Sequence, residues 1–225
     1  MAIAVVGSGL AGFTAYQALR RGGFAPEEIA VFGSDDDPAG PFRRRAEAIR
    51  QRRMRSESDG HCLPGTFPGL AVGAAVRRRS PVPLVASCLN RYHPTLEEFL
   101  AHVERVRGGS GWDRSLRPAR IERVLAVDGG FELDGHGRFR HVLVATGPPG
   151  LNVPAELHAD RRTVHAYEPH GYAATVTVVG AGLGAATEWL NALAAGAEVV
   201  SVRRREPVRR PLNVPREYFS RRGLA

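Results

Sequence analysis

The sequence contains no lysine: its 31 lysine-or-arginine positions are all arginine, against 23 aspartates and glutamates, and the formal charge is +8. A strongly basic chain invites a nucleic-acid interpretation. The arginines, however, fall into separate short runs with no aromatic residues among them: 43–45, 77–79 and 203–205. Such runs usually form solvated surface, and arginine without lysine, beside abundant alanine and glycine, is typical of a GC-rich genome. We therefore predict no nucleic-acid partner.

Cysteine and long apolar runs are also scarce. Cys62 and Cys88 are the two cysteines and form no CxxC pair, so no disulfide framework is indicated. No apolar run reaches the roughly 18 residues of a membrane span, and the start, MAIAVVGSG, lacks the features of a secretory signal. We expect a cytoplasmic protein without a membrane partner. His158, His165 and His170 share no metal-ligand spacing with cysteines or acids, so we predict no metal.

A glycine-rich turn occurs twice. VVGSGLAGF in the first copy returns as VVGAGLGAA in the second. Each copy follows a short apolar run typical of a buried parallel strand, opens a helical pattern and is followed by a second strand. Each therefore indicates a βαβ unit. The expected strand, helix and strand are 2–6, 10–21 and 29–32 in the first unit, and 175–179, 183–195 and 198–202 in the second.

Both turns have the pattern of dinucleotide-binding loops, G-x-G-x-x-G or G-x-G-x-x-A. The first glycine permits the tight turn, the second lets a pyrophosphate approach the backbone, and the third small residue allows close packing of helix and strand. The pyrophosphate then lies at the helix N-terminus. Glycine turns of an ordinary α/β sheet are the alternative. The candidate cofactor-binding residues are Gly7, Ser8, Gly9, Leu10, Ala11 and Gly12 in the first turn, and Gly180, Gly182, Leu183 and Ala185 in the second.

The residues that follow each unit favour different nucleotides. Arg203 and Arg204 come after the last strand of the second unit, where an NAD site usually carries an acid. Guanidinium groups suit a 2′-phosphate, which favours NADPH; an exposed arginine surface is the alternative. In the first unit Asp35 is the candidate for the adenosine ribose. It is displaced from the strand end, and a run of aspartates is also common in loops.

The rest of the chain divides into further predicted segments. Residues 40–94 carry several prolines, and we predict irregular structure, although 42–55 is compatible with a helix. A helix is predicted at 95–107, where Thr95 and Glu98 form a capping box. Residues 120–146 alternate with a period of two, which predicts a three-stranded meander that ends in a buried strand, HVLV. The domains are then 1–150, a linker 151–174, and a partial second unit 175–225.

Two such turns, separated by a meander that ends in VLVATG, resemble the flavoproteins with two dinucleotide-binding domains. This superfamily includes class B flavin monooxygenases, amino-acid N-hydroxylases and pyridine-nucleotide disulfide reductases. The resemblance covers most of the chain and implies an α/β fold with a Rossmann-like FAD-binding domain and a Rossmann-like NADPH-binding unit. In this superfamily the ATG segment, which here is Ala145, Thr146 and Gly147, runs beside the flavin nucleotide. The disulfide-reductase branch is disfavoured, because its chemistry needs two closely spaced redox cysteines.

Within this resemblance, the stretch MRSESDGH corresponds to the loop that returns toward the flavin. Arg55 is a candidate for charge near the flavin or its pyrophosphate, and Ser56 for a hydrogen bond. His61 is a candidate proton carrier, since the pKa of histidine is near neutrality. A solvated arginine, a turn serine and a surface histidine are the alternatives, and for His61 the surface role is favoured.

The implied function is an NADPH-dependent flavoprotein of monooxygenase type, in which hydride passes from NADPH to FAD and a small molecule is oxygenated. The sequence stops soon after the second strand of the second unit, where members of the superfamily usually continue, so we expect that unit to be incomplete. It is then a fragment, a unit completed by a second copy or a partner chain, or part of a shortened accessory protein. Such an accessory protein would bind nucleotides in a biosynthetic complex without full redox turnover.

Overall fold

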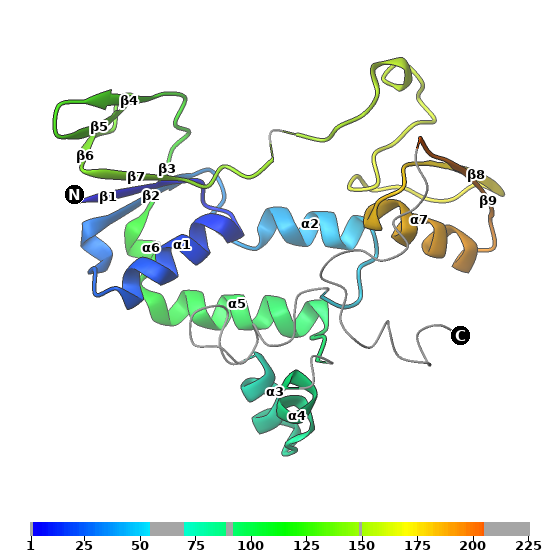
Figure 1. Ribbon diagram of the computed structural model, residues 1–225, viewed down its shortest axis with the longest axis horizontal. Helices are drawn as coiled ribbons and strands as arrows, with labels where there is room; N and C mark the ends of the chain where they lie inside the picture. The colour runs from blue at the N-terminus through cyan, green and yellow to red at the C-terminus, as the bar shows by residue number, and fades with distance from the viewer. Residues whose placement is uncertain (1, 55–69, 89–91, 149, 205–225) are drawn as a thin grey trace.

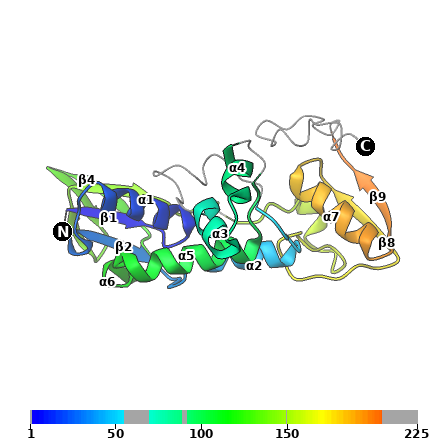
Figure 2. The same ribbon diagram turned by 90° about the horizontal axis from the view of Figure 1, so that it is seen from below.

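The computed structural model of the chain describes residues 2–54, 70–88, 92–148 and 150–204. A parallel sheet with its covering helices forms one end of an elongated molecule, and a small strand–helix–strand unit forms the other (Figures 1 and 2). In these ranges, no helix combines the length and the apolar character needed to span a membrane.

The first sheet has four parallel strands in the order β3–β2–β1–β7. These strands are β1 (Ile3–Val6), β2 (Ile29–Gly33), β3 (Leu116–Pro118) and β7 (His141–Val144). β1 lies in the interior of the sheet, with Ile3 aligned to Ile29 on one side and to His141 on the other. β1 and β2 are buried along almost their whole length, as their continuous apolar runs predict.

The two faces of this sheet contribute to two different cores, because successive strand residues point to opposite faces. One face is covered by α1 (Leu10–Arg21), α5 (Leu96–Ser110) and the short helix α6 (Trp112–Ser115). Its core includes Val5, Val31 and Trp112, whose indole lies edge-on against Phe13 and Tyr16 at centroid distances of 5.1 and 5.2 Å. A single-turn 3-10 helix, η1 (Pro26–Glu28), precedes β2.

An antiparallel meander covers the opposite face. It consists of β4 (Val124–Val127), β5 (Gly130–Leu133) and β6 (Gly137–Phe139), and its Leu133 and Phe139 pack on Ala4, Val6, Ala30 and Phe32 of the parallel sheet. The meander predicted over 120–146 was wrong in its last strand. HVLV leaves the meander and pairs with β1 in parallel as β7.

The prediction that this last strand is buried was also wrong. β7 is an edge strand in the described part of the chain, and Val144 is 68% exposed. An apolar run has the same composition whether its faces are covered or open, so the sequence of HVLV did not distinguish a central strand from an edge strand.

Residues 40–94 contain α2 (Gly40–Ala48), α3 (Leu70–Arg78) and α4 (Val82–Cys88). The irregular structure predicted for this region was wrong at α3 and α4, whereas α2 overlaps the stretch 42–55 that was compatible with a helix. Pro41 occupies the first turn of α2, where a missing N–H costs nothing. The buried face of α3 is formed largely by small residues, which give a weak periodic signal in an alanine-rich chain; these are Leu70, Ala71, Ala74 and Ala75.

The predicted capping box of the next helix is present. Thr95 caps α5 with its hydroxyl on the Glu98 N–H at 3.1 Å, and the Glu98 carboxylate accepts from the Thr95 N–H at 3.1 Å. The sequence predicts an end of this helix near residue 107, and this prediction was wrong. The helix continues through Gly108 and Gly109 to Ser110, whose carbonyl oxygen accepts the hydroxyl of Tyr16 at 2.9 Å. This tertiary contact favours the later end of the helix.

The second unit consists of β8 (Thr175–Val179), α7 (Leu183–Ala194) and β9 (Glu198–Val202), and its two strands pair in parallel. These bounds agree closely with the predicted ones. Residues 151–174 connect it to the first sheet and form one short 3-10 helix, η3 (Ala155–Leu157). α2 lies between the two ends of the molecule (Figures 1 and 2), and the carbonyl oxygen of Ile49 after it accepts a hydrogen bond from Asn191 of α7 at 2.8 Å.

Candidate nucleotide-binding sites

The first glycine turn lies where three parallel strands end. The Gly7 N–H donates to the Phe32 carbonyl at 2.7 Å, and the Ala145 N–H donates to the Val6 carbonyl at 2.7 Å. Gly7 has a φ of +118°, and a Cβ atom at this position would overlap the carbonyl oxygen of Ala145. The turn therefore requires glycine both for its backbone conformation and for the close approach of the segment after β7.

Two further contacts make this turn compact. A Cβ at Gly12 would overlap the carbonyl oxygen of Gly7, so helix α1 packs directly on the turn. Ser8 is buried, and a Cβ at Gly33 would overlap its hydroxyl oxygen. The small residue at the end of β2 therefore makes room for Ser8.

The outer side of the turn is open. In the described part of the chain, no atom lies within 4 Å of a Cβ added to Gly9, and no side chain caps the N-terminus of α1. The first N–H groups of a helix have no partner within the helix, and here they are those of Leu10, Ala11 and Gly12. These groups, together with the positive end of the helix dipole, form a cradle for an anionic group.

The cradle lies at the position in the sheet where ligands usually bind. The chain runs from β1 to β2 and β3 on one side and returns to β7 on the other, so the strand order reverses beside β1. In open α/β sheets the crevice at the carboxyl ends of the strands at such a point is the usual ligand site. The structure brings Ala145 and Thr146 against Gly7 at this edge, and Thr146 and Gly147 are exposed.

The second turn repeats the backbone of the first. The Gly180 N–H donates to the carbonyl of Val202 at 2.9 Å, as Gly7 does to Phe32 at 2.7 Å. No described atom lies within 4 Å of a Cβ added to Gly182, and no described side chain caps α7. Ala185 stands in place of the third glycine, with its Cβ at 3.4 Å from a Cβ added to Gly180. The second turn is thus an open cradle of the same kind, with looser packing.

The predicted charged residues take different positions. Asp35 forms an ion pair with Arg44 of α2, with an Oδ1–Nη2 distance of 3.3 Å. Arg203 and Arg204 follow β9 and are exposed, and neither forms an ion pair within the described ranges. The ribose role of Asp35 and the phosphate role of the two arginines remain predictions. Arg55, Ser56 and His61 lie outside the described residues.

No pattern in the sequence predicted a buried polar cluster between the connecting segment and α7. Glu188 is buried, and its Oε2 accepts the Tyr172 hydroxyl at 2.8 Å and lies 2.9 Å from Nε2 of His170. Burial and the Glu188 carboxylate raise the pKa of Tyr172. His170 and Glu188 are 18 residues apart, and no known motif spacing would have linked them. Among the described residues, no group of three or more His, Cys, Asp and Glu side chains is placed to hold a metal ion.

The architecture matches that of solved flavoproteins. The chain superposes on a mutant flavin monooxygenase from Stenotrophomonas maltophilia with a TM-score of 0.61 and 21% identity, covering 98% of this chain and 62% of that one. Bacillithiol disulfide reductase from Staphylococcus aureus gives 0.60 and 16%, covering 91% and 57%. OTEMO in complex with FAD and NADP gives 0.56 and 16%, covering 91% and 39%.

These likenesses concern the fold. They confirm the α/β class and the resemblance to flavoproteins with two dinucleotide-binding domains, at the level of architecture. The chain spans about three fifths of the length of the first two structures and about two fifths of the third. No protein-family model and no curated protein matches the sequence.

Proposed function

We propose that this protein is an NADPH-dependent flavin oxidoreductase of monooxygenase type that acts on a small molecule. One observation carries the proposal: the chain contains two glycine turns, each at the N-terminus of a helix and each with no described side chain over its second glycine. A single cradle fits one dinucleotide, whereas a flavin monooxygenase needs two.

FAD is assigned to the first cradle. The open surface at Gly9 and the free N–H groups of Leu10 and Ala11 would hold its pyrophosphate, and the backbone at Ala145–Thr146 borders the same crevice. When bound, FAD supplies the redox chemistry, while the residues of this chain bind and orient it.

NADPH is assigned to the second cradle. Gly182 and the first N–H groups of α7 would receive the pyrophosphate, and Arg203 and Arg204 the 2′-phosphate. Support comes from solved structures of the same fold that carry this nucleotide. These are OTEMO in complex with FAD and NADP, and an oxidized steroid monooxygenase bound to NADP.

A substitution at Gly9 tests the flavin assignment. Gly9→Val places a side chain in the open cradle, and the φ of −76° at Gly9 tolerates any residue. We expect loss of the visible absorbance of bound flavin with only a small fall in the melting temperature of the apoprotein, because valine is a poorer helix N-cap than glycine. Gly109→Val is the matched control, since Gly109 lies in α5 with no described atom within 4 Å of its added Cβ. If wild-type protein binds no FAD, the proposal is wrong.

The nicotinamide assignment is tested by removing the two arginines. In the double variant Arg203→Ala and Arg204→Ala, we expect NADPH affinity to fall while NADH affinity stays the same, because only NADPH carries the 2′-phosphate. Steady-state NADPH and NADH oxidation would measure the preference. An unchanged preference contradicts the assignment.

An accessory role in nucleotide binding, without redox turnover, is the second candidate. It is favoured by the small sheet of the second unit, where β8 and β9 have no further partners in the described residues and Val179 and Val202 are exposed. A protein of this kind would bind FAD yet consume no NADPH. Anaerobic reduction of bound flavin by NADPH separates the two candidates.

A further inference from the structure

Three consecutive arginines of α2 have different partners. Arg43 pairs with Asp37 at 3.0 Å, and Arg44 pairs with Asp35 at 3.3 Å. Arg45 is half-buried and forms no ion pair within the described residues; its guanidinium lies 6.0 Å from the ring centroid of Tyr167. The residue is partly exposed, and its guanidinium is therefore available to an anion that the described chain does not supply.

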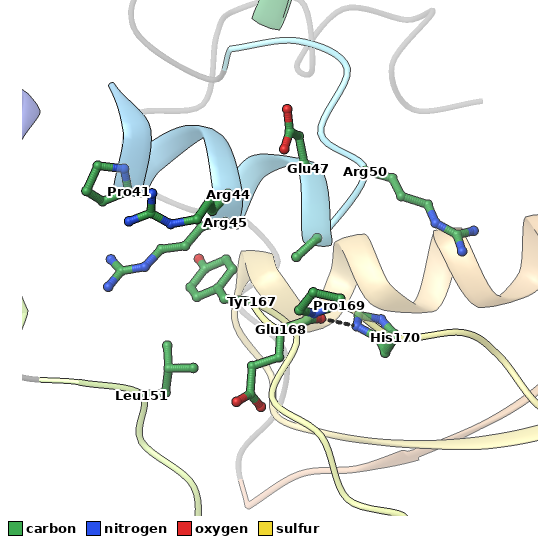
Figure 3. Close-up of a pocket in the computed structure, with 11 residues that line it drawn as sticks. Pro41, Arg44, Arg45, Glu47, Arg50, Leu151, Tyr167, Glu168, Pro169 and His170 are labelled. Atoms are coloured by element: carbon green, nitrogen blue, oxygen red, sulfur yellow. Dashed lines mark hydrogen bonds between the residues drawn. The ribbon is translucent and has the colours of Figure 1, made fainter. Parts of the chain in front are cut away.

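Arg45 lines a pocket of about 610 Å³ between α2 and residues 167–170. Sites for small organic molecules are typically about 300–1,000 Å³. In Figure 3, Pro41 and the guanidinium groups of Arg44 and Arg45 lie on one side, Leu151 lies opposite, and the Tyr167 ring lies next to Arg45. The pocket thus combines cations with a flat ring and apolar side chains.

The acidic residues that line the pocket do not form an ion pair with Arg45. The Glu47 carboxylate points away on the far side of α2 (Figure 3). The Glu168 carboxylate points away from Arg45 in the same view, and its Oε2 accepts the His165 N–H at 2.9 Å. No described acid therefore occupies the place of an anionic ligand beside Arg45.

The wall that carries Tyr167 is held by hydrogen bonds on both sides. The Glu168 N–H donates to the His165 carbonyl at 2.8 Å, and the ring of His170 contacts the Glu168 carbonyl at 2.7 Å and the buried Glu188 carboxylate at 2.9 Å. A wall ordered in this way loses little entropy when a ligand binds.

We propose that this pocket binds a small organic anion: a carboxylate or a phosphate attached to a flat, largely apolar body. Arg45 holds the anionic group with its planar fork of donors. Tyr167 stacks on the flat body, and Pro41 and Leu151 contact its edges. The site is separate from the two glycine cradles and goes beyond the proposed function, because binding there requires neither FAD nor NADPH.

The test is an NMR titration of the full-length chain with three probes of similar shape: benzoate, phenyl phosphate and neutral benzamide. At least one anion should bind at least about tenfold more tightly than benzamide, since a charge-assisted bidentate contact is lost in the neutral probe. The two anions distinguish a carboxylate site from a phosphate site. Equal binding of benzamide and both anions overturns the proposal.

Two variants and a control locate the binding. Arg45→Gln should weaken the anion at least about tenfold, whereas Arg161→Gln removes an exposed arginine outside the pocket and should change nothing. Leu151→Glu adds a carboxylate at a partly exposed position that faces Arg45, and it should abolish binding with the melting temperature unchanged. Wild-type affinity in both variants would overturn the assignment.

Competition separates this proposal from the proposed function. We expect saturating FAD and NADPH to leave the bound phenyl phosphate or benzoate in place. Displacement by either nucleotide would mean that the pocket belongs to that nucleotide, and the separate site would be wrong. Conversely, failure of the chain to bind FAD would contradict the proposed function but leave the expected probe binding unchanged.

Discussion

The two glycine turns have nearly the same backbone but different surroundings. In each, the first glycine donates its N–H to the end of the following strand, and no described atom lies within 4 Å of a Cβ added to the second glycine. Among the described residues, only the first turn is crowded: the Ala145 backbone leaves no room for a Cβ at Gly7, and the Gly7 carbonyl leaves none at Gly12. At Gly180, the nearest described neighbour is Ala185 at 3.4 Å.

This difference shows which features of the turns have a local cause in the sequence and which depend on tertiary packing. The glycine pattern suffices for a strand, a tight turn and an uncapped helix, because both copies form them. The crowding at Gly7 comes from β7, a strand far away in the sequence that lies beside β1. β8 has no such neighbour in the described residues. The same motif is therefore more tolerant of substitution in the second unit.

The largest expected effect is that of an alanine at the first glycine. Gly7→Ala should destabilise the fold by more than about 3 kcal/mol, since a positive φ and an overlap with Ala145 both oppose it. Gly180→Ala has a positive φ without backbone overlap and should cost about 1–2 kcal/mol. Urea unfolding measures both variants, and equal losses would remove the contrast between the turns.

A second contrast concerns helix caps, since α5 has a capping box and no described side chain caps α7. Burial raises the pKa of Glu98, but the Thr95 N–H and the Arg78 guanidinium lower it by more, so it lies below the ordinary value of 4.5. The stability due to the carboxylate is then present above about pH 4.5 and lost as the pH falls through the lowered pKa.

Glu98→Gln should therefore cost about 1–2 kcal/mol at pH 7 and flatten the fall in stability below pH 4.5. Glu97→Gln is the matched control: Glu97 is the exposed neighbour in the same helical turn and should have little effect. Unfolding at several pH values provides the measurement. A pH profile that is unchanged in Glu98→Gln would contradict the role of the carboxylate.

A substitution of the third small residue of the second turn should have a smaller effect on stability. Ala185→Gly recreates the pattern of the first turn within α7, and it should cost about 1 kcal/mol through helix propensity alone. NADPH binding should be retained, because glycine adds no atom to the cradle. A gain in stability would mean that Ala185 is strained, and the packing of the second turn would then be tighter than its distances indicate.

The smallest expected effect concerns the exposed apolar face of α7. Leu190 and Leu193 are 67% and 57% exposed, so Leu190→Gln and Leu193→Gln should change the unfolding free energy by about 0.5 kcal/mol or less if the chain is a monomer. Light scattering with thermal unfolding tests this. A loss of several kcal/mol together with a fall in molecular mass would instead show that a second copy covers this face.

Much of the fold was predictable where it depended on local chemistry. The bounds of β1, α1, β8, α7 and β9, and the capping box at Thr95, follow from apolar runs, glycines and hydrogen-bonding side chains close together in the chain. The helices α3 and α4 and the edge position of β7 did not follow. Their apolar faces are short or ambiguous, and packing against distant segments decides their structure.

By itself, the sequence determined the two strand–turn–helix units, because glycine spacing and helix starts act over a few residues. Only the tertiary structure decided the position of Ala145 over Gly7 and the pairing of Arg43 and Arg44 with acids. It also placed Arg45 beside Tyr167 with no acid partner among the described residues. These arrangements join residues from separate segments, and their geometry depends on how the segments pack rather than on any spacing along the chain.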